Sequence, residues 1–414
     1  MKVVAFALGC KVNKYEADSI LEDFKQKGCE VSDKLEYADI YILNTCAVTS
    51  EAEKKSRQLV ARCKKFNPNA KIYVCGCASQ KDISQFENKG VTFVKGNAGK
   101  QKMIDEIEKT GLFLEELPKN YEKMTFSHQN RTRAYIKIQD GCNNFCSYCI
   151  IPYLRGRSRS RELEDIIDEA KNLPSDVQEI VVVGINVSDY KIDDKKALIN
   201  VLEELDKLGK RVRLSSLEDG IIDEEFMIRL AKLKNFCPHF HLSLQSGSDS
   251  VLKRMNRHYT SQQFKHSVEI IRKYFPFAGI TTDVIVGYPK ESEEEFCETL
   301  NFVKDVEFSM LHIFQYSHRT GTVASKLEDV LPNVKKERAA RLEEVNKELQ
   351  SKFIKGNKEQ TLSVLIEEEK GGYFIGHSKN FIKCYIKGNK LKIGQIIDVK
   401  IEKEYLDGVI ANAV

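Results

Sequence analysis

Three cysteines with the spacing CxxxCxxC lie at residues 142–149, directly after an apolar stretch that predicts a β-strand: Cys142, Cys146 and Cys149. A 4Fe–4S cluster takes four thiolate ligands, so three cysteines leave one iron open to bind and reduce a small molecule. Structural zinc sites usually pair their cysteines as CxxC and close the tetrahedron with a fourth Cys or His. The alternative is three unrelated core cysteines that share this spacing by chance. The segment therefore predicts a site-open iron–sulfur cluster.

A second set of cysteines, Cys10, Cys46 and Cys77, is widely spaced in the first 80 residues. Each follows a predicted strand, and the carboxyl ends of parallel strands lie on one edge of a sheet, so the three thiols can converge there. Cys75 competes with Cys77, but a Cys75 that points inward from its strand leaves Cys77 better placed to bind a metal. The alternative is that all three are scattered small hydrophobic residues.

The elements around these cysteines predict an α/β protein. Short apolar runs at 3–7, 40–43 and 72–74 alternate with amphipathic stretches at 13–27 and 50–65, the second opened by a capping-box pattern at Ser50 and Glu53. We therefore expect a parallel α/β domain over residues 1–105. The charged segment that follows has few strand signals and predicts a linker at 106–127.

The central part of the chain repeats a strand-plus-helix unit six times. Strands are predicted at 135–138, 180–183, 212–215, 240–244, 280–286 and 310–314, with helices that include 162–172, 195–208, 291–306 and 335–355. Six units predict a partial (β/α)6 barrel at 128–355, open on one side. From residue 356 the alternation becomes that of short strands joined by glycine turns, which predicts a small antiparallel β barrel at 356–414.

Composition narrows the class of protein. The chain has 414 residues, 42% of them hydrophobic and 30% charged, enough for two or three globular domains. Its net charge is only +4, so affinity for a nucleic acid would depend on local clusters of charge. Apolar runs stay short of a membrane span, and twelve cysteines without a leader segment indicate reduced thiols. We therefore expect a cytoplasmic protein with no membrane partner.

Two basic segments are candidate RNA-binding surfaces. A loop after the CxxxCxxC motif carries Arg155, Arg157, Arg159 and Arg161, and loops at the carboxyl face of a barrel often carry function. The predicted C-terminal barrel carries Lys379, Lys383, Lys387 and Lys390, interleaved with Phe381 and Tyr385. Lysines beside aromatic rings are typical of single-stranded nucleic-acid surfaces. The alternative for both segments is an ordinary solvated face.

The cysteine motifs resemble those of the radical S-adenosylmethionine (SAM) methylthiotransferases. The similar strings are LGCKVN around Cys10, NTCAVT around Cys46, GCASQ around Cys77, and the CxxxCxxC run with its aromatic Tyr148. The resemblance extends over essentially the whole chain, through RLSSLE, HLSLQSGS and TTDVIVGYP to a C-terminal segment similar to the RNA-binding TRAM domain. It implies that the CxxxCxxC cluster binds SAM and yields a 5′-deoxyadenosyl radical. It also implies a second 4Fe–4S cluster on Cys10, Cys46 and Cys77 that presents sulfur, while another SAM donates the methyl group.

The resemblance also narrows the substrate. The string GCKVN is similar to the branch that adds a methylthio group at C2 of N6-threonylcarbamoyladenosine in tRNA, whereas the prenyl-adenosine branch favours GCQMN. A threonylcarbamoyl group carries a carboxylate, which the arginine loop could bind through planar guanidinium forks. Asn186 instead resembles the prenyl-adenosine branch. The alternatives are a prenyl-adenosine enzyme, an enzyme acting on an aspartate of a ribosomal protein, and a non-catalytic iron–sulfur RNA-binding protein.

Remaining site residues and partners follow from this resemblance and from barrel geometry. Active sites of barrels are built at the carboxyl ends of strands. We therefore expect the SAM contacts to come from Gly184, Asn186, Ser215, Glu218, Gln245, Ile285, Gly287 and Tyr148. The expected partners are a tRNA anticodon stem-loop, an external electron donor and a sulfur source, and the expected assembly is a monomer.

Overall fold

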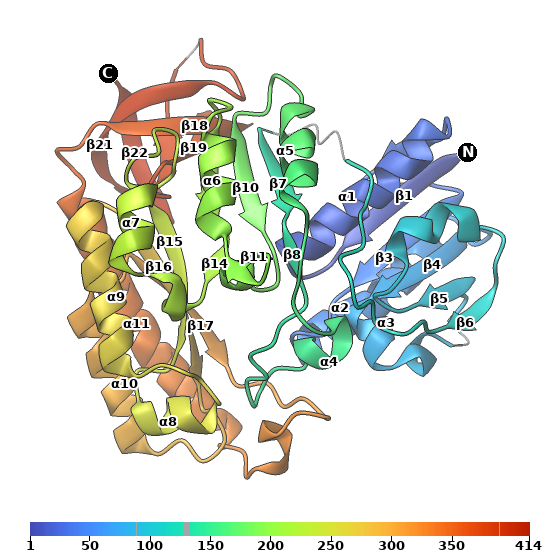
Figure 1. The fold of residues 1–414 in the computed structure, drawn as a ribbon, viewed down its shortest axis with the longest axis horizontal. Coiled ribbons are helices and arrows are strands. Elements are labelled where there is room, and N and C mark those ends of the chain that lie inside the picture. Colours follow the sequence, from blue (N-terminus) through green and yellow to red (C-terminus); the bar gives the residue numbers. More distant parts are fainter. Residues whose placement is uncertain (88, 127–131, 389) are drawn as a thin grey trace.

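The computed structural model describes residues 1–87, 89–126, 132–388 and 390–414, and it divides into an N-terminal domain, a core and a C-terminal barrel (Figure 1). The predicted boundary between linker and core, at residues 127 and 128, lies outside the described residues. No helix among the described residues is long and apolar enough to cross a membrane.

The N-terminal domain is built on a six-stranded parallel sheet. Its order is β2 (Glu30–Ser32), β1 (Lys2–Ala7), β3 (Ile40–Thr45), β4 (Lys71–Gly76), β5 (Phe93–Lys95) and β6 (Gly111–Phe113). Helix α1 (Lys11–Gln26) packs on one face, while α2 (Ser50–Phe66) and α3 (Cys77–Lys81) pack on the other. The three predicted strands and two predicted helices are confirmed.

Two local predictions in this domain are wrong. Helix α2 is capped by Thr49, whose side chain accepts a hydrogen bond from the Ala52 amide, so the predicted cap at Ser50 is one residue late. Strand β6 pairs in parallel with β5, so part of the predicted linker belongs to the sheet. Such a short strand carries little pattern of its own, and its pairing depends on its neighbour.

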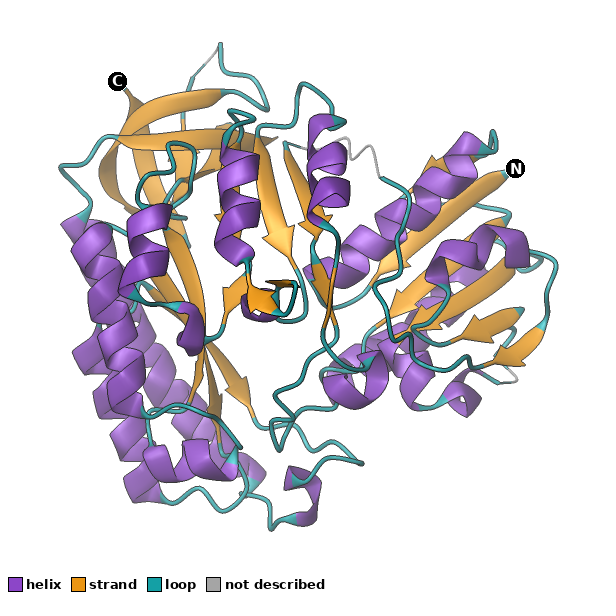
Figure 2. Ribbon diagram, in the orientation of Figure 1, coloured by secondary structure: helices purple, strands orange, loops and turns teal. Residues whose placement is uncertain are grey.

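The core contains all six predicted strands, arranged as two parallel sheets. One has the order β13 (Arg211–Leu214), β10 (Glu179–Val183), β7 (Arg133–Lys137), and the other has β14 (Ser216–Leu217), β15 (His239–Gln245), β16 (Gly279–Val286), β17 (Met310–Gln315). Residue 215 separates β13 from β14. Helices form a layer on the outer side of these strands (Figure 2): α5 (Leu163–Lys171), α6 (Leu198–Asp206), α7 (Glu224–Leu230), α9 (Ser261–Tyr274), α10 (Glu293–Val306) and α11 (Pro332–Gly356).

Smaller elements connect these units. They are β8 (Gln139–Asp140), α4 (Ile151–Arg155), β9 (Arg159–Ser160), β11 (Lys191–Ile192), β12 (Lys195–Lys196) and α8 (Asp249–Arg254). Strand β12 occupies the first residues of the helix that the sequence predicts from residue 195. Helix α6 therefore begins later than expected, because β12 pairs with β11 in a hairpin.

The C-terminal segment forms the predicted small barrel. Its closed order is β18 (Leu362–Lys370), β19 (Tyr373–Ser378), β20 (Lys383–Ile386), β22 (Gly408–Ala413) and β21 (Ile396–Tyr405). Four of the five strand pairings are antiparallel, but β20 and β22 run parallel, so the barrel is not purely antiparallel.

The barrel docks on the amino ends of the core strands through Phe381. This ring stacks on His239, at the start of β15, with centroids 4.5 Å apart, and on His377 at 4.7 Å. The guanidinium of Arg213 lies 4.8 Å from the centre of the same ring. Phe381 is thus part of a domain contact, which removes it from the aromatic surface that the sequence suggested for RNA.

Candidate active site

The CxxxCxxC loop follows β8 and turns sharply at Gly141. This residue has φ of +72°, and a Cβ atom there would lie 2.0 Å from the Arg157 carbonyl oxygen, so only glycine fits. The Cys149 amide donates to the Cys146 carbonyl, which curls the loop so that its cysteines approach one another. Burial raises the pKa of the Cys149 thiol to about 12, and the neighbouring thiols of Cys146 and Cys142 contribute to the rise. The three thiols therefore lie near one another.

Arg257 adds a positive charge to this group of thiols. One of its guanidinium nitrogens, Nη1, lies 3.2 Å from Cys146 Sγ, and the other, Nη2, donates to the Ser243 carbonyl at 3.0 Å and forms an ion pair with Glu218. The Arg257 guanidinium therefore places a positive charge beside the sulfur of Cys146. Sequence reasoning missed Arg257, because nothing in the spacing of its neighbours signals a contact with a loop more than a hundred residues earlier in the chain.

The second set of thiols gathers at one edge of the N-terminal sheet. Cys10, Cys46 and Cys77 each follow the carboxyl end of one of three adjacent strands, β1, β3 and β4. A Cβ atom on Gly9 would lie 2.4 Å from Cys46 Sγ, which places the first two motifs in contact. Burial raises the pKa of Cys46 to about 12, with Cys77 and Cys10 among the neighbours that contribute.

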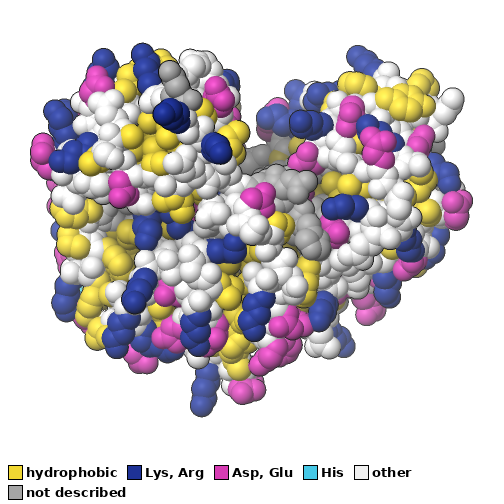
Figure 3. Space-filling model, turned by 90° about the horizontal axis from the view of Figure 1, so that it is seen from above, with side chains coloured by type: hydrophobic (Ala, Val, Ile, Leu, Met, Phe, Trp, Pro, Cys, Tyr) yellow, Lys and Arg dark blue, Asp and Glu magenta, His cyan; other side chains and the backbone are white. Residues whose placement is uncertain are grey.

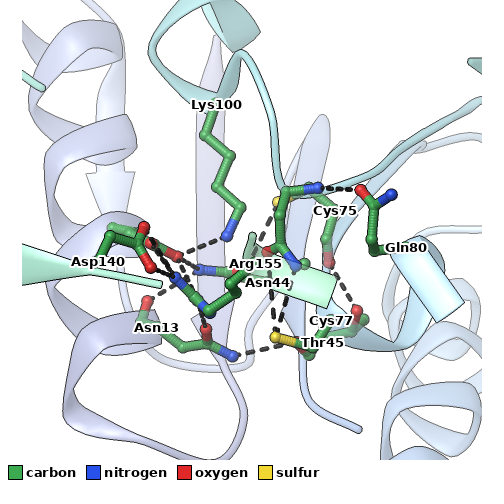
Figure 4. Close-up of polar contacts among 12 residues, drawn as sticks. Asn13, Asn44, Thr45, Cys75, Cys77, Gln80, Lys100, Asp140 and Arg155 are labelled. Carbon is green, nitrogen blue, oxygen red and sulfur yellow. Dashed lines mark hydrogen bonds and ion pairs between the residues drawn. The ribbon is translucent and has the colours of Figure 1, made fainter. Parts of the chain in front are cut away.

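Cys75 and Cys77 lie on opposite faces of the same sheet. Cys75 belongs to the apolar core under α1, and its Sγ lies 3.8 Å from Asn44 Oδ1. Cys77 lies on the face with α3, where Asn97 Nδ2 donates to its Sγ at 3.5 Å (Figure 4). Cys75 therefore points into the apolar core. With Cys75 in this orientation, Cys77 is the cysteine that is better placed to bind a metal.

A mononuclear metal site does not match either set. Among the described residues, no group of three or more His, Cys, Asp or Glu side chains is arranged to hold one metal ion. An iron–sulfur cluster carries its irons at different corners, so its thiolates need not meet at one point. The donor set, two groups of three thiols, fits the thiolate ligands of iron–sulfur clusters.

A buried ionic network joins the N-terminal domain to the core, with Arg155 at its centre (Figure 4). The Arg155 guanidinium donates to Glu16 of α1 at 2.9 Å, to Asp140 of β8 at 3.0 Å and to Asn13 at 2.6 Å. Only 1% of the Arg155 side chain is exposed. The predicted RNA contact is therefore wrong for Arg155, whose charge is used between the domains.

Two further arginines of the same loop are also occupied inside the protein. Arg161 forms a buried ion pair with Glu169, and Arg159 Nη1 donates to the carbonyls of Arg155 and Arg157 at 2.8 and 2.9 Å. The prediction is wrong for both, because both side chains are buried and their Nη atoms already donate to groups of the protein. Arg157 is exposed, and its guanidinium lies 4.4 Å from the centre of the Phe145 ring.

A cavity of about 600 Å³ opens beside the CxxxCxxC loop. Asn143 and Asn144 of that loop, Arg257, and two of the predicted SAM contacts, Asn186 and Glu218, line it. Asn186 Oδ1 is buried and has no hydrogen-bond partner among the residues that the structure describes, and the same holds for Ser215 Oγ at the break between β13 and β14. Buried polar atoms without partners mark positions where a polar ligand would satisfy them, so these residues fit SAM.

The other predicted SAM contacts are spread over neighbouring strand ends. Gln245 ends β15 with φ of +69°, and a Cβ on Gly184 would meet Val187 Cγ1 at 2.9 Å. Tyr148 and Ile285 pack together in a small apolar cluster. Gly287 is required by packing, since a Cβ there would lie 2.4 Å from a carbon of a lysine on α11. None of these lines the cavity as Asn186 and Glu218 do.

The lysines predicted to bind RNA have different surroundings. Lys379 Nζ donates to a backbone carbonyl of the core at 3.0 Å, and Lys383 forms an ion pair with Asp407 at 2.8 Å. Lys387 and Lys390 are exposed, and Lys387 lies 5.5 Å from the centre of the Tyr373 ring.

In Figure 3 a notch separates the N-terminal domain from the lobe that carries the C-terminal barrel, with Lys and Arg side chains on both sides.

Comparison with known proteins agrees with this geometry. Residues 136–303 match the Radical SAM superfamily, and residues 2–96 match the Uncharacterized protein family UPF0004. The chain is 40% identical to the threonylcarbamoyladenosine tRNA methylthiotransferase MtaB of Bacillus subtilis (strain 168), over 97% of this chain and 94% of that protein. It is 36% identical to MtaB of Aquifex aeolicus (strain VF5), over 97% of this chain and all of the relative.

The chain belongs to the radical SAM methylthiotransferase family.

Another relative of this methylthiotransferase is named for a different nucleoside. The chain is 35% identical to the tRNA-2-methylthio-N(6)-dimethylallyladenosine synthase of Bacillus licheniformis, over 95% of this chain and 82% of that protein. Among solved structures, the methyltransferase TsrM from Kitasatospora setae, with cobalamin and a 4Fe–4S cluster bound, superposes with a TM-score of 0.57 at 13% identity, over 78% of this chain and 76% of that one. That likeness concerns the fold. Membership of the radical SAM family implies a 4Fe–4S cluster and SAM as cofactors.

Proposed function

We propose that this enzyme adds a methylthio group to N6-threonylcarbamoyladenosine in the anticodon stem-loop of tRNA. The observation that carries the proposal is that each of the two domains holds a set of three thiols, and that Arg155, shortly after the CxxxCxxC motif, makes buried contacts with Glu16 of the N-terminal domain and Asp140 of the core. The names of the MtaB relatives, at 36–40% identity over nearly the whole chain, support the substrate.

In this proposal the two sets divide the work. Cys142, Cys146 and Cys149 hold the cluster that binds SAM, which supplies a 5′-deoxyadenosyl radical when bound. The set on the N-terminal sheet, Cys10, Cys46 and Cys77, holds a second 4Fe–4S cluster that presents the sulfur. The chain itself orients both groups, since the network around Arg155 fixes α1 against the loop that follows the CxxxCxxC motif.

Residues around the cavity would position SAM. Asn186 Oδ1 and Ser215 Oγ offer buried acceptors that no group in the described part of the chain uses. Arg257 contacts both Glu218 and Cys146, so that it links the wall of the cavity to a proposed cluster ligand. Arg157 and the exposed lysines Lys387 and Lys390 would contact the phosphates of the RNA. An external electron donor, a sulfur source, a monomeric state and a cytoplasmic location complete the proposal.

The decisive test is nucleoside analysis of tRNA from a strain that lacks this gene. Loss of the methylthio form of threonylcarbamoyladenosine, with restoration by the wild-type gene, is the expected result. Loss of methylthio prenyl-adenosine instead would establish the alternative that the relatives named for dimethylallyladenosine support. Unchanged tRNA would leave the ribosomal-protein alternative.

Cysteine variants test the division of labour. Replacing Cys142, Cys146 and Cys149 with Ala should remove about four irons per chain and abolish formation of 5′-deoxyadenosine. Replacing Cys10, Cys46 and Cys77 should also remove about four irons, but should preserve reductive SAM cleavage while stopping methylthio transfer. Reductive SAM cleavage by the first variant would refute the assignment of the SAM-binding cluster.

A further inference from the structure

Helix α1 inserts its first turn into the open side of the core. Val12 is buried against Val181 and Val183 of β10, with Tyr135 of β7 beside them. Val181, Val183 and Tyr135 lie on the inner face of these strands, because the alternating residues Ile136, Ile180 and Val182 belong to the outer apolar layer under the helices. Lys11, which precedes Val12 and begins α1, therefore lies at the inner face of the partial barrel.

This inner face is polar where α1 meets it. His241 Nε2 lies 3.3 Å from Asp283 Oδ2, its Nδ1 lies 2.8 Å from Thr281 Oγ1, and the His312 ring centre is 5.3 Å away. The neighbouring residues along these strands, such as Phe240, Leu242 and Val284, are in the outer apolar core. Polar groups on the inner face of a partial barrel offer hydrogen-bond partners to a polar ligand.

Lys11 is the cation of this region that has no acidic partner among the described residues. The nearby acid Glu179 is already shared by Arg213 at 2.7 Å and Arg133 at 2.8 Å. Arg213 also donates to two backbone carbonyls of the C-terminal barrel, at 3.0 and 3.2 Å, and is buried. Lys11, in contrast, is exposed.

The surroundings of Lys11 combine access to solvent with nearby protein charge. The guanidinium groups of Arg213 and Arg133 are among the charges near Lys11. The side chain is nevertheless exposed, as is Cys10 next to it. Lys11 is thus accessible from solvent. An anion that reached it would meet an ammonium that forms no ion pair with a carboxylate among the described residues.

We propose that Lys11 binds the carboxylate of the threonylcarbamoyl group and so determines the choice of substrate. This inference rests on the proposed function, and it deepens it. Lys11 directly follows Cys10 in the chain, so its backbone lies next to one of the thiols proposed to present sulfur. It takes the role that the sequence suggested for the arginine loop, whose members Arg155, Arg159 and Arg161 are buried and occupied.

The physical basis is that a substrate without a carboxylate would leave the charge of Lys11 without a partner. A carboxylate neutralises the Lys11 ammonium, whereas an apolar prenyl group would displace its water and leave the charge without a partner. Sites that bind a charged or hydrogen-bonding group reject analogues without it, because their own polar groups are then left unpaired. A contact of this kind therefore acts on the modified group alone and leaves the affinity for the RNA backbone unchanged.

The test compares dissociation constants for labelled anticodon stem-loops, measured by fluorescence anisotropy without SAM. The wild-type protein should bind the threonylcarbamoyl stem-loop about 10- to 100-fold more tightly than the same RNA with its carboxylate converted to a carboxamide, as expected for hydrogen bonds to a charged group. Lys11→Gln should bind both RNAs with the weaker constant, and Lys11→Arg should restore much of the preference. The matched control is Lys14→Gln on the same helix, because Lys14 is paired with Asp18 and Asp33 at 2.8 and 3.0 Å.

Two results overturn the inference. One is a wild-type protein that binds acid and carboxamide equally, which requires no variant and so does not depend on folding. The other is a Lys11→Gln variant that folds and retains the wild-type preference. Failure of the proposed function is distinguishable, since it would show as wild-type methylthio transfer to prenyl-adenosine, or to no tRNA, whatever the Lys11 variants do.

Discussion

Removal of the Arg155 guanidinium should destabilise the protein by weakening the contact between the N-terminal domain and the core. Arg155→Met keeps an unbranched apolar side chain but removes every donor to Glu16, Asp140 and Asn13. Breaking a buried ion pair by removing one partner typically costs about 3–5 kcal/mol, because the other partner keeps a buried and uncompensated charge.

The structure places the expected cost at the lower end of this range. Glu16 retains Lys100 at 2.5 Å and Lys137 at 2.8 Å, and Asp140 retains Lys137 at 2.7 Å. We therefore expect a loss of about 3 kcal/mol. At about 2.1 cal/mol/K per residue, this loss lowers the melting temperature by about 3 °C if the whole chain unfolds as one unit, and by about 12 °C if a domain of about 115 residues unfolds by itself.

Thermal unfolding of the iron-free protein, followed by circular dichroism, measures this effect without a contribution from cluster binding. Arg341→Met is the matched control, because Arg341 on α11 pairs with Glu293 while its side chain is 34% exposed. Such surface pairs contribute about 1 kcal/mol or less. Glu16→Gln, alone and combined with Arg155→Met, completes a double-mutant cycle in which the coupling should exceed about 1 kcal/mol.

The reasoning fails if Arg155→Met lowers the melting temperature no more than Arg341→Met does. It also fails if the effects of Arg155→Met and Glu16→Gln add without coupling. Either outcome would mean that the network does not hold α1 against the loop that follows the CxxxCxxC motif, and that the two thiol sets are positioned by other contacts.

Three further predictions follow from single contacts. Burial alone would raise the pKa of Glu179, but two guanidinium groups outweigh it and hold the pKa at about 2. The wild-type protein should therefore be more stable than Glu179→Gln near neutral pH, and this advantage should be lost as the pH falls from about 5 to about 2. Urea titrations at several pH values measure it. Replacing Lys387 and Lys390 with Ala should lower the slope of log affinity against log salt by up to about two units for any tRNA, and an unchanged slope would exclude this surface from the RNA path. Cys77→Ser should lose about four irons while Cys75→Ser keeps them, and the reverse pattern would show that Cys75 is the ligand.

Much of the candidate site was readable from local pattern. Short apolar runs predict the strands before Cys10, Cys46 and Cys77. Because parallel strands of one sheet end on one edge, the sequence alone predicts that these three thiols lie close together. The spacing CxxxCxxC likewise belongs to one continuous loop. The domain order and all six core strands rest on the same periodicity.

The surfaces for RNA were predicted less well, because charge in a sequence does not show burial. The sequence predicts that Arg155 is a solvated loop residue. In the structure it contacts Glu16 of α1, which lies 139 positions away in the chain. Phe381 reads as an exposed ring on a basic strand, yet it is the contact on which the C-terminal barrel docks.

By itself, the sequence determined the elements, their order and the two sets of thiols, since these depend on the periodicity and spacing of neighbouring residues. Only the tertiary structure decided which charges remain free to act. Arg155, Arg159 and Arg161 are neutralised or satisfied by partners from other elements, while Lys11 is left without an acidic partner in the described structure beside Cys10. The reason is physical, because a charge acts on a ligand only where the fold neither buries it nor pairs it, and both conditions depend on residues distant in the chain.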